Sequence, residues 1–224
     1  MMEHSFYLFS RRQKIMFYLK LVSLFILINV FIGALLFFCG LSGFSLLFLA
    51  ISLTVFAPFV DVPSGMKNGS LLYYSPLLIA EKMKNNQLVL HSGSLFDYYF
   101  ALDFTSTAQE RKRRVFIANI KGLLALIAQY EQQNSTNIRI KVTSYIINPR
   151  TANKLGLQRQ KTDFIQLFIL YFNFVNLTCA MSLLKGKFTL PNLKQVYTFE
   201  GELDVLIANK AYLQGLQKRL LKTA

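Results

Sequence analysis

The sequence predicts an α/β (α+β) domain at the cytoplasmic face of a membrane, tethered by an N-terminal two-helix transmembrane hairpin. Residues 21–60 contain no Asp, Glu, Lys or Arg. Forty uncharged residues are enough for two membrane spans, because one span takes about 20 apolar residues. The residues that follow mix helical and strand-like patterns of hydrophobicity. The 224-residue chain therefore divides into an anchor and one domain with its own core.

The uncharged run is interrupted near its middle by Gly40-Leu41-Ser42-Gly43, which favours a tight turn. We therefore predict a hairpin over residues 17–60, with spans at about 17–39 and 43–60. A cleaved signal sequence is less favoured, because its apolar core is typically about 7–15 residues long. Basic residues flanking a span stay on the cytoplasmic side, and the preceding segment supplies four: Arg11, Arg12, Lys14 and Lys20.

This arrangement predicts a multi-pass protein of the inner (cytoplasmic) membrane. The basic N-terminus, residues 1–16, and the main domain would both be cytoplasmic, since two spans return the chain to its starting side. Residues 61–224 hold 21 of the 25 basic residues and 10 of the 11 acidic ones. Expected partners are the lipid bilayer, through anionic headgroups, and a protein partner. Nucleic acid is less favoured, because no recognition motif accompanies the charge.

The first part of the domain begins after a turn-rich linker at 61–70. Residues 71–91 read as two strands joined by a turn, with Pro76 placing the first at an edge or bulge. The aromatic-rich segment 95–104 fits either a strand or a helix. These residues open the α/β domain, which we assign to 71–224.

A helix over 108–132 is the clearest element of the domain. Thr107 and Glu110 have capping-box spacing, and apolar residues then recur on one helical face. Residues 138–147 follow as a strand, and 151–155 as a short helix ended by glycine. A second, amphipathic helix is predicted at 202–221, with acids near its start and bases near its end.

Residues 164–184 carry no charge and are long enough for a third span. A second interpretation is a buried helix or two core elements in tandem. A third is a helix that lies in the membrane interface. Polar side chains at Asn173 and Asn176 and the basic residues that follow favour an internal or interfacial helix.

Candidate catalytic residues are His91 and Asp97, which flank a Gly-Ser turn. An aspartate can orient a histidine for acid/base chemistry. The alternative, which we favour, is a turn with a hydrogen-bonded histidine and an aspartate capping the next element. No metal site is predicted, because no Cys or His pair has ligand spacing.

Four consecutive basic residues, Arg111, Lys112, Arg113 and Arg114, lie in the first turns of the 108–132 helix. Cations are unfavourable there, and an anion bound at the helix start would relieve the conflict. These residues are the candidates for binding a lipid phosphate, a nucleotide or a coenzyme pyrophosphate. A solvated basic face turned toward the bilayer is the other interpretation.

The segment after the 138–147 strand reads Asn148-Pro149-Arg150-Thr151-Ala152-Asn153-Lys154-Leu155-Gly156-Leu157. Together with the preceding helix and strand, it resembles the N-acyltransferase (GNAT) superfamily over residues 108–157. In that superfamily the phosphates of acyl-coenzyme A meet the start of the long helix. Here Thr107–Lys112 replaces the family's glycine-rich loop. The resemblance implies an acyl-CoA-dependent enzyme or a degenerate relative of one.

The sequence thus predicts a membrane-anchored accessory or interaction protein that presents a basic domain at the membrane. The alternative is a membrane-bound N-acyltransferase-like enzyme, and only that alternative implies a cofactor, acyl-coenzyme A.

Overall fold

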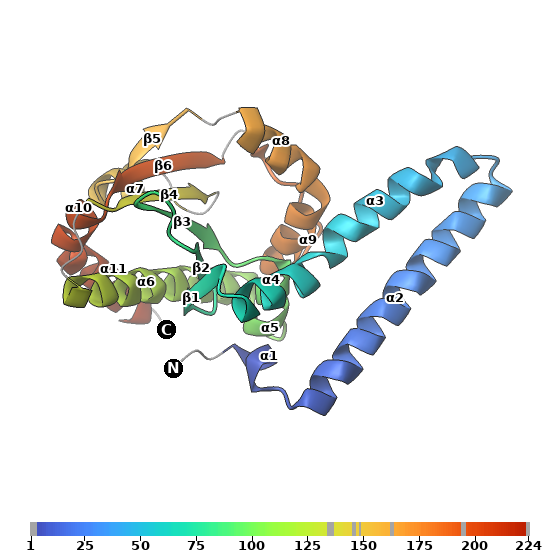
Figure 1. Cartoon of the computed structure of the whole chain (residues 1–224), viewed down its shortest axis with the longest axis horizontal. Coiled ribbons are helices and arrows are strands. Elements are labelled where there is room, and N and C mark those ends of the chain that lie inside the picture. The colour runs from blue at the N-terminus through green and yellow to red at the C-terminus, as the bar shows by residue number, and fades with distance from the viewer. Residues whose placement is uncertain are drawn as a thin grey trace.

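The structure is a computed structural model and describes residues 4–133, 137–144, 147, 149–161, 164–193 and 196–222. Figure 1 shows helices packed around a sheet, with two long helices projecting from one side. The predicted α/β class is confirmed, because helices and a six-stranded mixed sheet share two apolar cores.

The sheet has the strand order β1-β2-β3-β4-β6-β5. Among the strands that the structure describes, only β3 and β4 are parallel; every other neighbouring pair is antiparallel. The predicted two-stranded segment 71–91 forms three strands, because Pro76 lacks an amide for the ladder and divides its first half. The strands are β1 (Leu71–Ser75), β2 (Leu78–Glu81), β3 (Gln87–Ser92), β4 (Arg139–Ser144), β5 (Gln158–Gln160) and β6 (Tyr197–Glu202).

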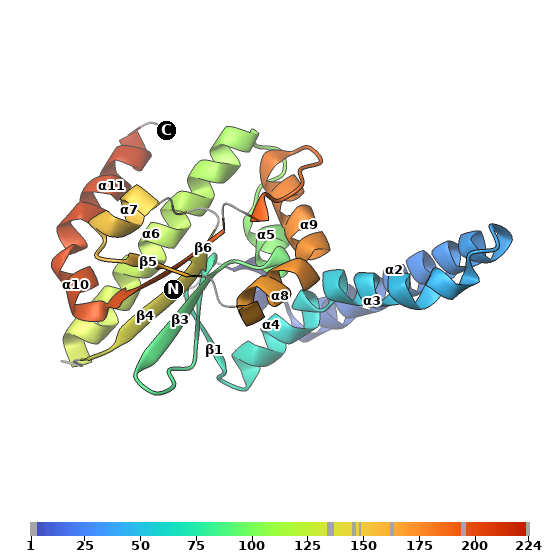
Figure 2. The same ribbon diagram turned by 90° about the horizontal axis from the view of Figure 1, so that it is seen from above.

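Helix α6 (Ala108–Gln133) confirms the predicted helix and connects the parallel strands β3 and β4. It packs on β1 and β2, with α11 (Lys210–Lys222) beside it (Figures 1 and 2). The approach is close at Gly122, where a Cβ atom would stand 2.7 Å from the Leu78 side chain. The sheet and α6 enclose the first core with α7 (Pro149–Lys154), α10 (Leu203–Ala208) and α11 (Lys210–Lys222).

The second core is aromatic and surrounds Phe96 on α5 (Leu95–Ala101), which resolves the segment 95–104 as mainly helical. Helix α1 (Ser5–Leu8) folds back onto α5, where the Ser5 hydroxyl donates to the Phe100 carbonyl over 2.8 Å. Phe6 is 2% exposed and lies edge-on to Phe96. The N-terminal segment is therefore part of the domain's core.

The two projecting helices are α2 (Arg11–Phe38) and α3 (Ser45–Phe56), joined through the short helix η1 (Ser42–Phe44). Among the described residues, α2 is the one helix long and apolar enough by itself to cross a membrane. Helix α3 reaches that length only together with α4 (Pro58–Lys67), and the two are bent by 44°. The Ser52 hydroxyl donates to the Asn29 side chain over 2.9 Å and links α3 to α2.

The bend between α3 and α4 follows from Pro58, which cannot donate a hydrogen bond to the Thr54 carbonyl. The side-chain amide of Asn176, on α9 (Phe174–Lys185), donates to that carbonyl over 3.1 Å instead. Residues 61–67, expected in the linker, continue as α4, with Phe59 and Val62 buried against the aromatic core. Proline at the first turn and this burial favour the helix over a turn.

Residues 164–184 form α8 (Phe164–Phe172) and α9, separated at Asn173. Neither is long enough to cross a bilayer, and α9 packs against α5 and α6. Two core elements in tandem were among the expected alternatives; α9 contributes to the aromatic core, whereas the large apolar side chains of α8 are exposed. The predicted helix 202–221 is likewise divided, into α10 and α11, and its first residue belongs to β6. The strands β5 and β6 were not predicted.

Replacing Asn176 by Leu tests the contact that Pro58 makes necessary. We expect a loss of about 1 kcal/mol in unfolding free energy, the lower end of the range for an unpaired polar group, because the contact is partly buried. Thermal unfolding in detergent measures the loss. Asn173→Leu is the matched control, because the Asn173 side-chain amide donates locally, to the Ile169 carbonyl of α8. Equal losses in both variants would contradict the role of Asn176.

Candidate functional site

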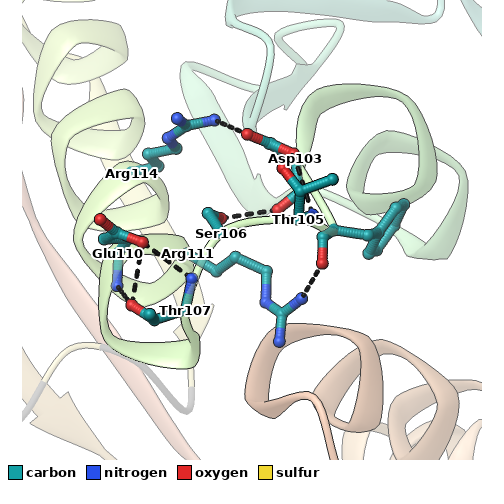
Figure 3. A network of polar contacts seen from close by, with 8 residues as sticks. Asp103, Thr105, Ser106, Thr107, Glu110, Arg111 and Arg114 are labelled. Carbon is teal, nitrogen blue, oxygen red and sulfur yellow. Dashed lines mark hydrogen bonds and ion pairs between the residues drawn. The ribbon is translucent and has the colours of Figure 1, made fainter.

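The predicted anion site lies where the loop after α5 enters α6, and Figure 3 shows its polar network. The four basic residues are not gathered around one point. Arg111 points into the protein and is 6% exposed, whereas Arg114 extends toward Asp103 of the loop. The network therefore consists of separate local contacts around the start of α6, not of four cations that face one site.

Arg111 connects three segments of the chain. Its Nε donates to the Leu184 carbonyl, at the end of α9, and its Nη1 to the Phe104 carbonyl, each over 3.3 Å. A cation at the C-terminus of a helix is favourable for the helix dipole. Gly186 ends α9 in the left-handed region at φ 65°, and a Cβ atom there would clash with Arg111 Nη2. Arg111 thus acts as a structural clamp.

Asp103 lies near the start of the loop between α5 and α6 and accepts hydrogen bonds from that loop. The Thr105 hydroxyl and amide donate to its Oδ1 over 2.6 and 3.0 Å, and Arg114 Nη1 lies 3.6 Å from its Oδ2. The Thr105 hydrogen bonds, more than the arginine, hold the pKa of Asp103 below its ordinary value. The carboxylate consequently neutralises part of the basic cluster.

The start of α6 has a capping box, as predicted. The Glu110 amide donates to the Thr107 hydroxyl over 3.3 Å, and the Thr107 amide and hydroxyl donate to the Glu110 carboxylate over 2.8 and 2.9 Å. These bonds lower the pKa of Glu110. A carboxylate of this protein therefore already lies at the helix start, and an incoming anion would share that position with it.

His91 and Asp97 are not brought together. His91 Nε2 lies 2.7 Å from Glu81 Oε1 across β2 and β3, on an exposed part of the sheet. This contact lowers the pKa of Glu81. Asp97 is fully buried and caps α5, accepting from the Ser94 amide and hydroxyl over 2.6 and 2.7 Å. These positions correspond to the favoured alternative of a hydrogen-bonded histidine and a capping aspartate.

Asp97 has a buried histidine beside it that sequence spacing did not indicate. His4 Nε2 lies 3.3 Å from Asp97 Oδ1, and both side chains are 0% exposed. The Tyr73 hydroxyl donates to the same carboxylate oxygen, and burial raises the pKa of Tyr73. Burial also raises the pKa of Tyr7 to about 12. A separation of 93 residues conceals this pair in the sequence, although the aromatic residues just after His4, Phe6 and Tyr7, are a signal that could have suggested burial.

The carboxyl ends of the parallel strands β3 and β4 are the second place where a ligand would be expected. Their pairing ends at Leu90 and Val142, whereas the strands run on to Ser92 and Ser144, so they separate there. A cavity of about 20 Å³ lies beside these strands, between the sheet, α6 and α10, and is lined mainly by aliphatic side chains. That volume holds about one water molecule, so a larger ligand would require the side chains that line the cavity to move.

The four residues predicted to set the topology lie around the start of α2. Arg11, Arg12 and Lys20 are exposed, and Lys14 Nζ lies 5.5 Å from the centre of the Phe6 ring. Ser10 caps the helix in a capping box with Gln13. Within the described part of the chain, no group of three or more His, Cys, Asp or Glu residues could hold a metal ion.

Comparison with known proteins does not assign the chain to a family. No protein-family model, no curated protein and no solved structure matches the chain.

Replacing Arg111 by Ala tests its role as a clamp. We expect a loss of about 3 kcal/mol in unfolding free energy, because the buried Leu184 carbonyl and the partly buried Phe104 carbonyl both lose a charged donor. Thermal unfolding in detergent measures the loss, and Lys112→Ala is the control, since Lys112 is exposed on the next position of α6. Equal unfolding temperatures for the two variants would contradict the clamp, because Arg111 would then contribute no more to stability than the exposed Lys112.

Proposed function

We propose that the protein is anchored in the inner membrane by the α2–α3 hairpin and presents its α/β domain as an accessory or interaction module. The observation that carries this proposal is the surface of the two projecting helices. Large apolar side chains are exposed along both, including Phe31 at 68%, Leu27 at 66% and Leu46 at 77%. Water is an unfavourable environment for a surface of this kind, whereas a bilayer is a favourable one.

The hairpin returns to the side from which it starts. At one end, α1 is buried against α5; at the other, α4 packs on the same helix. Both ends are therefore fixed to one domain, which supports an even number of membrane crossings. Helix α2 is long enough for one crossing; α3 reaches such a length only with α4, whose core-facing residues hold its far end to the domain.

The charges near the domain support a cytoplasmic orientation. Arg11 and Arg12 are exposed in the first turn of α2, which holds no acidic residue. Basic flanks are retained on the cytoplasmic side and are attracted by anionic headgroups. We therefore place the N-terminus and the domain in the cytoplasm, next to anionic lipid, with a protein partner as the expected object of recognition.

Cysteine labelling in intact cells tests this topology. Cys39 ends α2 at the far turn and is exposed, and Cys179 is half-buried in the domain. In a Cys179→Ala background, Cys39 should react with a membrane-impermeant maleimide added from outside, because two crossings place the turn there. Cys39→Ala combined with Lys84→Cys moves the reporter to a domain loop and should react only after permeabilisation. Labelling of the Lys84→Cys variant in intact cells would contradict the cytoplasmic orientation.

A second candidate function is acyl-CoA-dependent N-acyl transfer. The order α6, β4, α7 and a left-handed Gly156 supports it, because this order carried the resemblance to the N-acyltransferase superfamily. The parallel strands that separate beside α6 also support it. Coenzyme phosphates would lie near Arg113 and Arg114, while Arg111 is already engaged in the clamp.

Thermal unfolding with acyl-coenzyme A tests this second candidate. At 100 times the dissociation constant, one bound ligand should stabilise the full-length protein by about 2.7 kcal/mol. Arg113→Ala combined with Arg114→Ala should remove the gain without removing the Arg111 clamp. Absence of any shift at millimolar acyl-coenzyme A would exclude this function, whatever the topology.

A further inference from the structure

A groove lies between α3 and the corner where α8 meets α9. Its volume is about 550 Å³. One wall is a single face of α3, in which Ala50 leaves space between Leu47 and Thr54. The other wall consists of aromatic and aliphatic side chains at the corner, chiefly Tyr171 and Phe172. Figure 1 shows α8 and α3 extending in different directions from α9.

The walls of the groove offer little to a polar ligand. The Thr54 hydroxyl is engaged within its own helix, donating to the Ile51 carbonyl over 2.8 Å. The Thr54 carbonyl is also engaged, because it accepts from Asn176 at the α9 end of the groove. What remains is an elongated apolar surface, which suits a hydrocarbon chain.

The exposed side chains of α8, next to the groove, also require an apolar environment. Six of its nine residues are large apolar or aromatic side chains that are at least half exposed. Phe164 at 79% and Tyr171 at 66% are the extreme cases. Nine residues cannot cross a bilayer, so the helix must lie along apolar material. Lys161, exposed three residues before α8, is close enough for its amine to stay at the polar boundary.

From this geometry we infer that the groove binds a hydrocarbon chain of a membrane lipid. The inference rests on the proposed anchoring, because α3 then lies in the bilayer. A lipid chain reaches the groove along the surface of α3 without crossing water, and its local concentration there is high. The groove adjoins the exposed apolar surface of the hairpin, so the two surfaces share one apolar environment.

The chain contains no tryptophan, which makes a single fluorescent reporter available. Phe172→Trp places one in the groove wall. The full-length protein is purified in detergent, and phosphatidylcholine with dibrominated acyl chains is added at a low mole fraction, so that bulk lipid is dilute. We expect a saturable decrease in fluorescence of about twofold near one lipid per chain. Leu221→Trp, on α11 and away from the hairpin, should show no saturable decrease.

A matched pair of substitutions, each made in the Phe172→Trp background, assigns the decrease to the groove. Ala50→Phe fills the space on α3 and should abolish the saturable decrease of the groove reporter. Ala34→Phe makes the same change on α2, outside the groove, and should leave the decrease intact. Quenching that rises only in proportion to lipid and ignores Ala50→Phe would overturn the proposal. So would an absence of quenching with dimers seen by light scattering, because a second copy would then cover the groove.

This result is separable from the test of topology. If Cys39 is labelled from outside while the Phe172→Trp reporter shows no saturable quenching, the lipid site fails and the anchor stands. If Cys39 is not labelled from outside, the anchoring proposal fails whatever the fluorescence shows.

Discussion

The structure depends on one constraint: a long apolar helical extension has both of its ends fixed to a single domain. The aromatic core around Phe96 provides both attachments, since Phe6 enters it before α2 and Phe59 enters it in α4. These rings are packed edge to face, an arrangement that adds attraction to the burial of area. Separating either end of the extension from the domain would disrupt this core. Packing therefore sets both where the extension leaves the domain and where it returns to it.

Polar side chains that look reactive in the sequence serve this packing. Asp97 takes donors from Ser94 and Tyr73 and lies beside a fully buried His4, so that an ionisable group in an aromatic core is compensated from several sides. Arg111 compensates the end of α9 in the same way. Asn176 replaces the donor that Pro58 lacks. Most of these contacts join segments distant in sequence, and each lies where the hairpin or its supporting helices meet the domain.

The parts of the fold governed by local pattern were predictable. Helix α6 and its capping box followed from the Thr107–Glu110 spacing and a 3.6-residue period. The α/β class followed from alternation of such patterns. The strand β6 was not predicted, because its acidic end resembled the first turn of a helix, and pairing with β4 overrides that local preference. Likewise Asn173 and Asn209 divide two apparently continuous helices.

The sequence by itself determined that the chain has an uncharged stretch long enough for a bilayer, preceded by basic residues. The charge and the hydropathy of a segment are sums over its own residues, so both can be obtained without knowing the tertiary structure. Only the tertiary structure decided the partners of the ionisable groups. It pairs His91 with Glu81 and Asp97 with His4, and it turns Arg111 inward. Such pairings depend on which surfaces meet when helices and strands pack, and sequence separation carries no information about that.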